Sequence, residues 1–170
     1  EGTIRRGFCK KAKNKLKDIP GLKVVGITGS YGKTSTKYIV NTILSQKYNT
    51  LMTPESYNTT MGVVRTINEK LTSMHQLFVC EMGAKYVGDI KEITDIVNPT
   101  YTAIGPQHLD TFKNLDNVRK TKLELVDSLP DDEGIAFLNW EDENIRNSRI
   151  TKKSVKFGLT PEADYYAENI

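Results

Sequence analysis

Residues 24–36 read Val24-Val25-Gly26-Ile27-Thr28-Gly29-Ser30-Tyr31-Gly32-Lys33-Thr34-Ser35-Thr36, which is the most specific pattern in the sequence. A hydrophobic strand runs into a glycine-containing loop, and a helix is expected to begin at Lys33. Glycines allow backbone N–H groups to approach phosphate oxygens closely, and the helix N-terminus adds partial positive charge. The stretch therefore predicts a phosphate-binding loop, whose residues are Thr28, Gly29, Ser30, Tyr31, Gly32, Lys33, Thr34 and Ser35.

The loop departs from the common phosphate-loop pattern, Gly-x-x-x-x-Gly-Lys-(Ser/Thr). The position five residues before Gly32 is Ile27, and the first glycine is Gly29, three residues before it. The order of strand, Gly-Lys-Thr and helix is kept, so Lys33 is expected to reach the terminal phosphates and Thr34 to ligate Mg²⁺. The alternative is a glycine-rich strand-to-helix turn that binds no ligand.

Short apolar runs alternate with helical patterns from residue 22 onward. This alternation predicts an α/β fold, in which a mostly parallel sheet carries the phosphate loop and has helices on both faces. The strands are expected at 22–28, 50–53, 76–81, 101–105 and 134–139, and the helices at 33–48, 62–71, 87–97 and 117–129. Two further short strands are expected at 154–158 and 163–170, with no helix between them.

Composition indicates one globular domain. The chain has 170 residues, of which 38% are hydrophobic and 26% charged, and no apolar run approaches the roughly 18 residues that span a membrane. Cys9 and Cys80 form neither a disulfide framework nor a metal-ligand spacing, so a cytoplasmic location is expected. Residues 1–17 hold seven of the basic residues against Glu1 alone. We interpret this segment as a helix or linker leading into the fold, and nucleic-acid or membrane-surface binding is the alternative.

Three more residues are expected near the phosphate loop, because ligands bind beyond the carboxyl ends of parallel strands. Glu81 ends an apolar strand, where a carboxylate can hold Mg²⁺. His108 follows the strand at 101–105, and neutral imidazole is a good metal ligand. Lys122 lies in the helix at 117–129, where composition alone indicates a solvated face and does not distinguish it from Lys120.

The sequence resembles the Mur ligases, the ATP-dependent enzymes that add amino acids to the peptidoglycan precursor. The loop is similar to that family's Thr-Gly-x-x-Gly-Lys-(Thr/Ser) loop. The segments at 81–84 (Glu-Met-Gly-Ala) and 104–109 (Ile-Gly-Pro-Gln-His-Leu) look most like those of the member that adds D-alanyl-D-alanine. The resemblance covers about residues 20–170.

The resemblance implies a role for each matching residue. Lys33 and Thr34 would hold the phosphates of ATP and a first Mg²⁺, with Glu81 as its carboxylate ligand. A second Mg²⁺ would be held by His108 and by Lys122 as its carbamate, which offers the hard anionic oxygens that an ammonium group lacks. Asn139 lies in a segment that resembles the family's segment near the adenine, and Asn58 and Thr59 lie in one that resembles its substrate-side loop. Lys33, His108 and Lys122 are thus the catalytic candidates.

By the same resemblance, residues 21–170 would be the central ATPase domain, truncated at its C-terminal end, and residues 1–20 a basic leader from a missing N-terminal domain. The implied activity is phosphorylation of a UDP-MurNAc-tripeptide carboxylate by ATP, followed by amide formation with D-Ala-D-Ala. The isolated piece would be incomplete for turnover without its N- and C-terminal domains. The alternatives are another Mur or folylpolyglutamate-type ligase, and a non-catalytic nucleotide switch.

Overall fold

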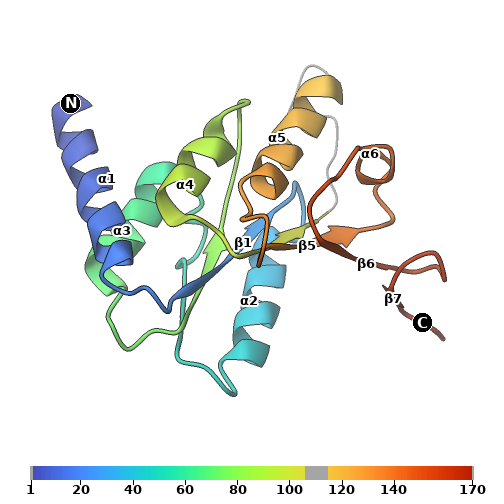
Figure 1. Ribbon diagram of the computed structural model, residues 1–170, viewed down its shortest axis with the longest axis horizontal. Helices are drawn as coiled ribbons and strands as arrows, with labels where there is room; N and C mark the ends of the chain where they lie inside the picture. The colour runs from blue at the N-terminus through green and yellow to red at the C-terminus, as the bar shows by residue number, and fades with distance from the viewer. Residues whose placement is uncertain (1, 106–114, 170) are drawn as a thin grey trace.

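A parallel β-sheet with the order β2-β3-β1-β4-β5-β6-β7 forms the centre of the computed structural model, which describes residues 2–105 and 115–169 (Figure 1). Every pair of neighbouring strands is parallel. The strands are β1 (Lys23–Thr28), β2 (Thr50–Met52), β3 (Leu77–Glu81), β4 (Tyr101–Ile104), β5 (Ile135–Asn139), β6 (Ser154–Gly158) and β7 (Tyr165–Tyr166). The predicted α/β class is confirmed.

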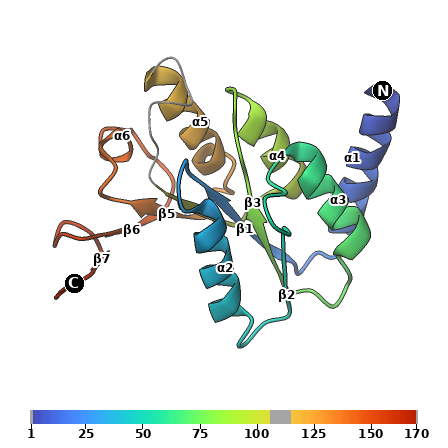
Figure 2. The same cartoon turned by 180° about the vertical axis from the view of Figure 1, so that it is seen from behind.

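Helices lie on both faces of the sheet, as expected, but unequally (Figures 1 and 2). The helix α2 packs Val40 and Leu44 on one face, against Val25, Ile27 and Val79. The other described helices lie on the opposite face. The helices are α1 (Gly2–Lys17), α2 (Lys33–Leu44), α3 (Thr60–Lys70), α4 (Asp89–Val97), α5 (Leu115–Asp127) and α6 (Glu143–Arg146).

The central strands are buried on both faces, which explains their unbroken apolar runs. All five residues of β3 are buried, as are residues 24–28 of β1. At Gly26 an added Cβ would lie 3.0 Å from both Met82 Cε and Leu125 Cδ1, so the missing side chain lets the helix layer approach β1. This close packing fixes the carboxyl end of β1, where the phosphate loop begins.

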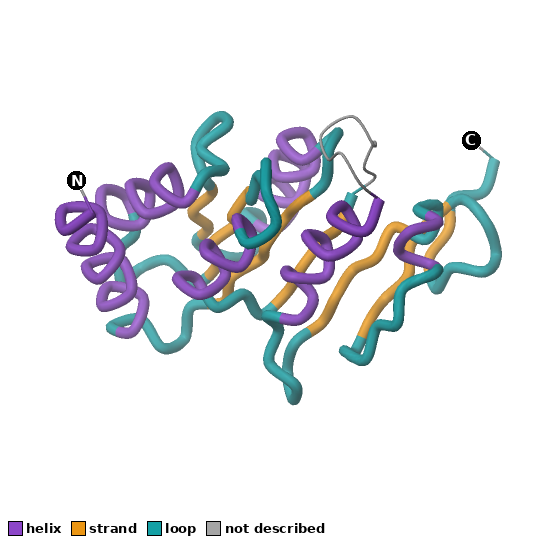
Figure 3. The backbone as a smooth tube through the Cα atoms, turned by 90° about the horizontal axis from the view of Figure 1, so that it is seen from above, coloured by secondary structure: helices purple, strands orange, loops and turns teal. Residues whose placement is uncertain are grey.

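The basic N-terminal segment forms α1, one of the two forms that we expected. Ala12 is fully buried, and Cys9 and Leu16 pack against the same core as α3 and α4. Figure 3 shows α1 beside α3 at one end of the sheet. The hydrophobic side of the helix is therefore part of the domain core, while most of its charged residues are exposed.

Several boundaries differ from the sequence expectations. Helix α2 ends at Leu44 rather than at residue 48, since Ser45 to Tyr48 turn back on its last carbonyls. The short helix α6 was not predicted, and Asp142 caps it by accepting a hydrogen bond from the Asn144 N–H at 2.9 Å. The last strand, β7, has two residues rather than the eight expected at 163–170.

No helix in the described part of the chain is both long enough and apolar enough to cross a bilayer.

Candidate functional site

The phosphate loop leaves β1 at the carboxyl edge of the sheet and enters α2. Gly29 has φ +147° and Gly32 has φ +73°, which are backbone conformations that other residues rarely adopt. A Cβ on Gly29 would lie 3.1 Å from the Gly105 Cα, so the loop also passes closely over the end of β4. Both glycines are thus required by the path of the loop.

Thr28 fixes the start of this loop rather than pointing into open space. Its hydroxyl is buried and donates to the Met82 carbonyl at 2.9 Å. The Met82 N–H in turn donates to the Ile27 carbonyl at 2.8 Å, so the ends of β1 and β3 are joined twice. The structure thus places the Thr28 side chain between strands, where it holds the loop in register with β3.

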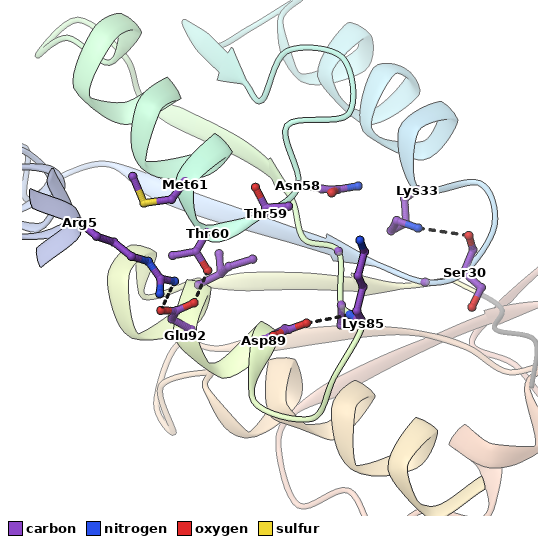
Figure 4. A pocket seen from close by; sticks show the side chains of 14 residues that line it. Arg5, Ser30, Lys33, Asn58, Thr59, Thr60, Met61, Lys85, Asp89 and Glu92 are labelled. Carbon is purple, nitrogen blue, oxygen red and sulfur yellow. Dashed lines mark hydrogen bonds and ion pairs between the residues drawn. The ribbon is translucent and has the colours of Figure 1, made fainter. Parts of the chain in front are cut away.

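Lys33 and Thr34 open α2. The Lys33 Nζ donates to the Ser30 carbonyl at 3.2 Å, which brings its ammonium group over the loop (Figure 4). Gly32 precedes the helix without a side-chain cap. Glycine has no side chain to accept from the first N–H groups of α2, and such N–H groups at a helix N-terminus can bind an anion.

The carboxylate of Glu81 is the centre of the site. Glu81 is the last residue of β3 and is 1% exposed. Its Oε1 accepts from Asn58 Nδ2 at 3.0 Å, and its Oε2 lies 3.0 Å from Lys37 Nζ. The Thr34 hydroxyl lies 3.2 and 3.1 Å from the two oxygens. Three side chains, two from α2 and one from the turn before α3, therefore converge on one buried carboxylate.

The Thr34–Glu81 pair fits a bound Mg²⁺. Both residues offer hard oxygen atoms, and a carboxylate has about four lone-pair directions, so its contacts with Lys37 and Asn58 leave capacity for a metal. No group of three or more His, Cys, Asp or Glu side chains comes together in the part of the chain that the structure describes. Two protein ligands suit Mg²⁺ where phosphate oxygens and water complete its shell.

A pocket of about 550 Å³ opens beside the phosphate loop. Its walls come from that loop, from residues 58–61, from the segment after β3 and from α4, with Arg5 of α1 at its far end (Figure 4). Glu92 accepts from Arg5 at 2.6 Å and from Thr60 at 2.5 Å, which ties α1, α3 and α4 together. The Lys33 and Lys85 side chains both line the pocket, so it can receive an anionic group.

The two substrate-side candidates lie in this pocket but have distinct contacts. Asn58 touches Glu81, as described, whereas Thr59 caps α3 by accepting a hydrogen bond from the Gly62 N–H at 3.3 Å. The segment after β3 is held against them, because the Gly83 N–H donates to the Asn58 carbonyl at 2.8 Å. The pocket wall is therefore continuous with the carboxylate site.

The remaining candidates are not all described. Asn139 ends β5 at the same edge of the sheet, and its Oδ1 accepts from the Glu141 N–H at 3.0 Å. His108 lies outside the described residues. Lys122 lies within α5, although its side chain is not among those described. The proposed second metal site therefore stays a prediction.

The sequence pattern did not predict a role for Lys37. Its ammonium group is 0% exposed and pairs with Glu81. The available signal was helical spacing, because residues three and four apart share one face of a helix and Lys37 follows Thr34 by three positions. Nothing in the sequence alone shows that this face turns inward.

The sheet order, the loop and the buried carboxylate define the class: an α/β domain with a phosphate loop at the carboxyl edge of its sheet. The chain belongs to the Mur ligase family, and residues 27–170 match the model of the Mur ligase middle domain. The UDP-N-acetylmuramoyl-tripeptide–D-alanyl-D-alanine ligase of Escherichia coli is 35% identical over 155 residues, which are 87% of this chain and 34% of that protein.

Two solved structures agree with this assignment. A crystal structure of MurF from Acinetobacter baumannii superposes with a TM-score of 0.86 at 30% identity, and the match covers 98% of this chain and 37% of that one. MurF from Thermotoga maritima in complex with ADP has a TM-score of 0.79 at 30% identity, covering 90% of this chain and 36% of that one. The chain thus spans about a third of the length of these relatives.

Proposed function

We propose that this chain is the nucleotide-binding part of an ATP-dependent ligase that joins UDP-MurNAc-tripeptide to D-Ala-D-Ala. The observation that carries the proposal is the convergence of Thr34 and Asn58 on the buried carboxylate of Glu81, beside the phosphate loop. Solved relatives of this fold include MurF proteins, one of them in complex with ADP. A similar nucleotide would lie along residues 28–35.

The loop residues would bind and orient the phosphates. Backbone N–H groups around Gly29 and Gly32 and the N-terminus of α2 would face the phosphate oxygens, and Lys33 would neutralise charge on the terminal phosphates. Thr34 and Glu81 would hold Mg²⁺, which supplies charge neutralisation when bound. Asn139 would lie toward the adenine, as the resemblance implies.

In such a ligase, ATP transfers its terminal phosphoryl group to the substrate carboxylate, with release of ADP. The amine of D-Ala-D-Ala then attacks the acyl phosphate, forming the amide bond and releasing phosphate. The pocket beside Lys33 would receive the end of the peptide substrate, with Lys85 attracting its negative charge and Asn58 and Thr59 forming one wall. The protein would mainly position and neutralise the reacting groups.

The finer parts of the proposal concern residues whose side chains are not described. A second Mg²⁺ would be held by His108 and by carbamylated Lys122, both of which we expect at the carboxyl edge of the sheet.

Residues 21–170 would be the central domain, preceded by α1 as the connection from an N-terminal domain. We propose that the protein works in the cytoplasm.

The test is turnover by the full-length polypeptide that carries this sequence. Phosphate release should require UDP-MurNAc-tripeptide, D-Ala-D-Ala, ATP and Mg²⁺ together, and Lys33→Ala should lower it by at least about 100-fold. The exposed Lys47→Ala is the matched control and should leave the rate unchanged. Amide formation with a different amine would indicate a sister ligase. ATP binding without any carboxylate-dependent phosphate release would contradict the ligase assignment.

A further inference from the structure

Lys37 is an unusual residue for the inside of a domain. Its side chain is 0% exposed, and its partner Glu81 is 1% exposed. Lysine is almost never fully buried unless it is paired, because removing an ammonium group from water is unfavourable. A buried apolar side chain of similar volume would often be as stable, so the pair is weak evidence for a role in stability alone.

The contacts of Lys37 join three segments of the chain. From the second turn of α2, its Nζ approaches Glu81 Oε2 at the end of β3 and also donates to the main-chain carbonyl of Glu55. Glu55 has φ +44°, a left-handed conformation that is uncommon for a residue other than glycine. The turn that contains Glu55 leads directly to Asn58, the other side chain bound to the carboxylate.

The two contacts hold the carboxylate from opposite oxygens. Lys37 lies at Oε2 and Asn58 at Oε1, so rotation of the carboxylate would break at least one of them. In this orientation both oxygens lie within 3.2 Å of the Thr34 hydroxyl. Thr34 is exposed while Glu81 is buried, so the carboxylate presents its oxygens to the side from which phosphate and metal would enter.

We propose that Lys37 is a positioning residue for the metal site: it holds the Glu81 carboxylate facing Thr34 and ties it to the turn that carries Asn58. The inference rests on the proposed function, in which Thr34 and Glu81 hold Mg²⁺. Lys37 touches neither the nucleotide nor the metal in this account. Residues that orient metal ligands in this way commonly change metal affinity by about 10- to 100-fold when they are replaced.

The experiment is a calorimetric titration of the full-length polypeptide with ADP at a series of Mg²⁺ concentrations. Lys37→Met keeps a similar volume without the charge. The Mg²⁺ requirement is the Mg²⁺ concentration at which half of the metal-dependent increase in ADP affinity is reached. Lys37→Met should raise this concentration by at least about tenfold. ADP binding without Mg²⁺ should change little, since the loop and Lys33 are untouched. Asn58→Ala should shift the Mg²⁺ requirement in the same direction.

Lys152 offers a matched control at the opposite edge of the sheet. It is also mostly buried and likewise contacts one carboxylate, Asp131, and one main-chain carbonyl, that of Leu129. Lys152→Met should leave the Mg²⁺ requirement unchanged. A purely structural role for Lys37 would instead lower ADP binding equally with and without Mg²⁺, and this result would overturn the proposal.

Lys37→Arg keeps the charge and decides the matter if Lys37→Met does not fold. The proposal predicts that this variant keeps a metal-dependent gain in ADP affinity but needs more Mg²⁺ than the unmutated protein. An unchanged Mg²⁺ requirement in Lys37→Arg would refute it. If the unmutated protein binds ADP with no dependence on Mg²⁺, the metal site itself fails, and that result is distinct from a failure of Lys37 alone.

Discussion

Replacing Gly83 by alanine should disconnect Asn58 from the site. An added Cβ would lie 2.8 Å from both Cγ and Oδ1 of Asn58 and 3.1 Å from its Nδ2, so the side chain must move. The backbone cannot move apart easily, because the Gly83 N–H donates to the Asn58 carbonyl. We therefore expect loss of the hydrogen bond from Asn58 to Glu81.

The expected cost follows from the nature of that bond. A hydrogen bond to a charged group contributes about 1.5–3 kcal/mol to stability. Glu81 keeps its contacts with Lys37 and Thr34, so the free energy of unfolding should fall by about 1.5 kcal/mol, the lower end of that range. Urea unfolding of the 170-residue chain, followed by circular dichroism, measures this change. Gly21→Ala is the control, since no atom lies within 4 Å of the Cβ it would add.

A double-mutant cycle tests the reasoning directly. Asn58→Ala removes the same hydrogen bond and also the atoms that Gly83→Ala would meet. The double variant should therefore unfold within about 0.5 kcal/mol of Asn58→Ala alone. If the two single effects add in the double variant, the substitution at Gly83 acts through something other than Asn58, and this account of the contact is wrong.

Three further predictions concern other parts of the structure. Thr59→Ala removes the N-cap of α3 and should lower the free energy of unfolding by about 1 kcal/mol, measured by urea unfolding, with no change for the exposed Thr42→Ala. Burial, and secondarily the charge of Glu81, raises the pKa of the Cys80 thiol. A thiol reagent should therefore label Cys9 in the native chain and Cys80 only after unfolding, and equal labelling rates at both cysteines would contradict this. The hydrogen bond from Lys152, and secondarily the positive charge of Lys152, lowers the pKa of Asp131. The Asp131 carboxylate therefore stabilises the fold at a pH above its unfolded pKa of about 4. This contribution is lost as the pH falls through the lower pKa of the folded state. NMR titration should find this shift abolished in Lys152→Met.

Much of the fold was predictable because strands and helices leave different patterns of hydrophobic residues in the sequence. Apolar runs such as 77–81 are typical of strands buried on both faces. At 89–97 the apolar residues recur every three or four positions, as in a helix with one buried side. The phosphate loop was predictable for a local reason, since its glycines and the Lys-Thr pair are adjacent in the chain. Helix α6 was missed because four residues are too few to show a helical period.

The candidate site was predictable only in part. Thr34 and Glu81 were expected near each other because parallel strands end at one edge of a sheet, and the structure brings them within 3.2 Å. Asn58 was expected only from the family resemblance, and its contact with Glu81 depends on the turn at 54–58. Lys37 looks like a solvated lysine in sequence, because charge predicts exposure and only tertiary packing shows its burial.

Calorimetric titration of Mg²⁺–ATP into the unmutated chain and into Lys33→Ala tests whether residues 28–35 bind nucleotide phosphates. We predict saturable binding by the unmutated chain and a loss of affinity of at least about tenfold in Lys33→Ala, which is at least about 1.4 kcal/mol. Equal affinity of the two proteins would show that the nucleotide binds elsewhere and would contradict the phosphate loop as its site.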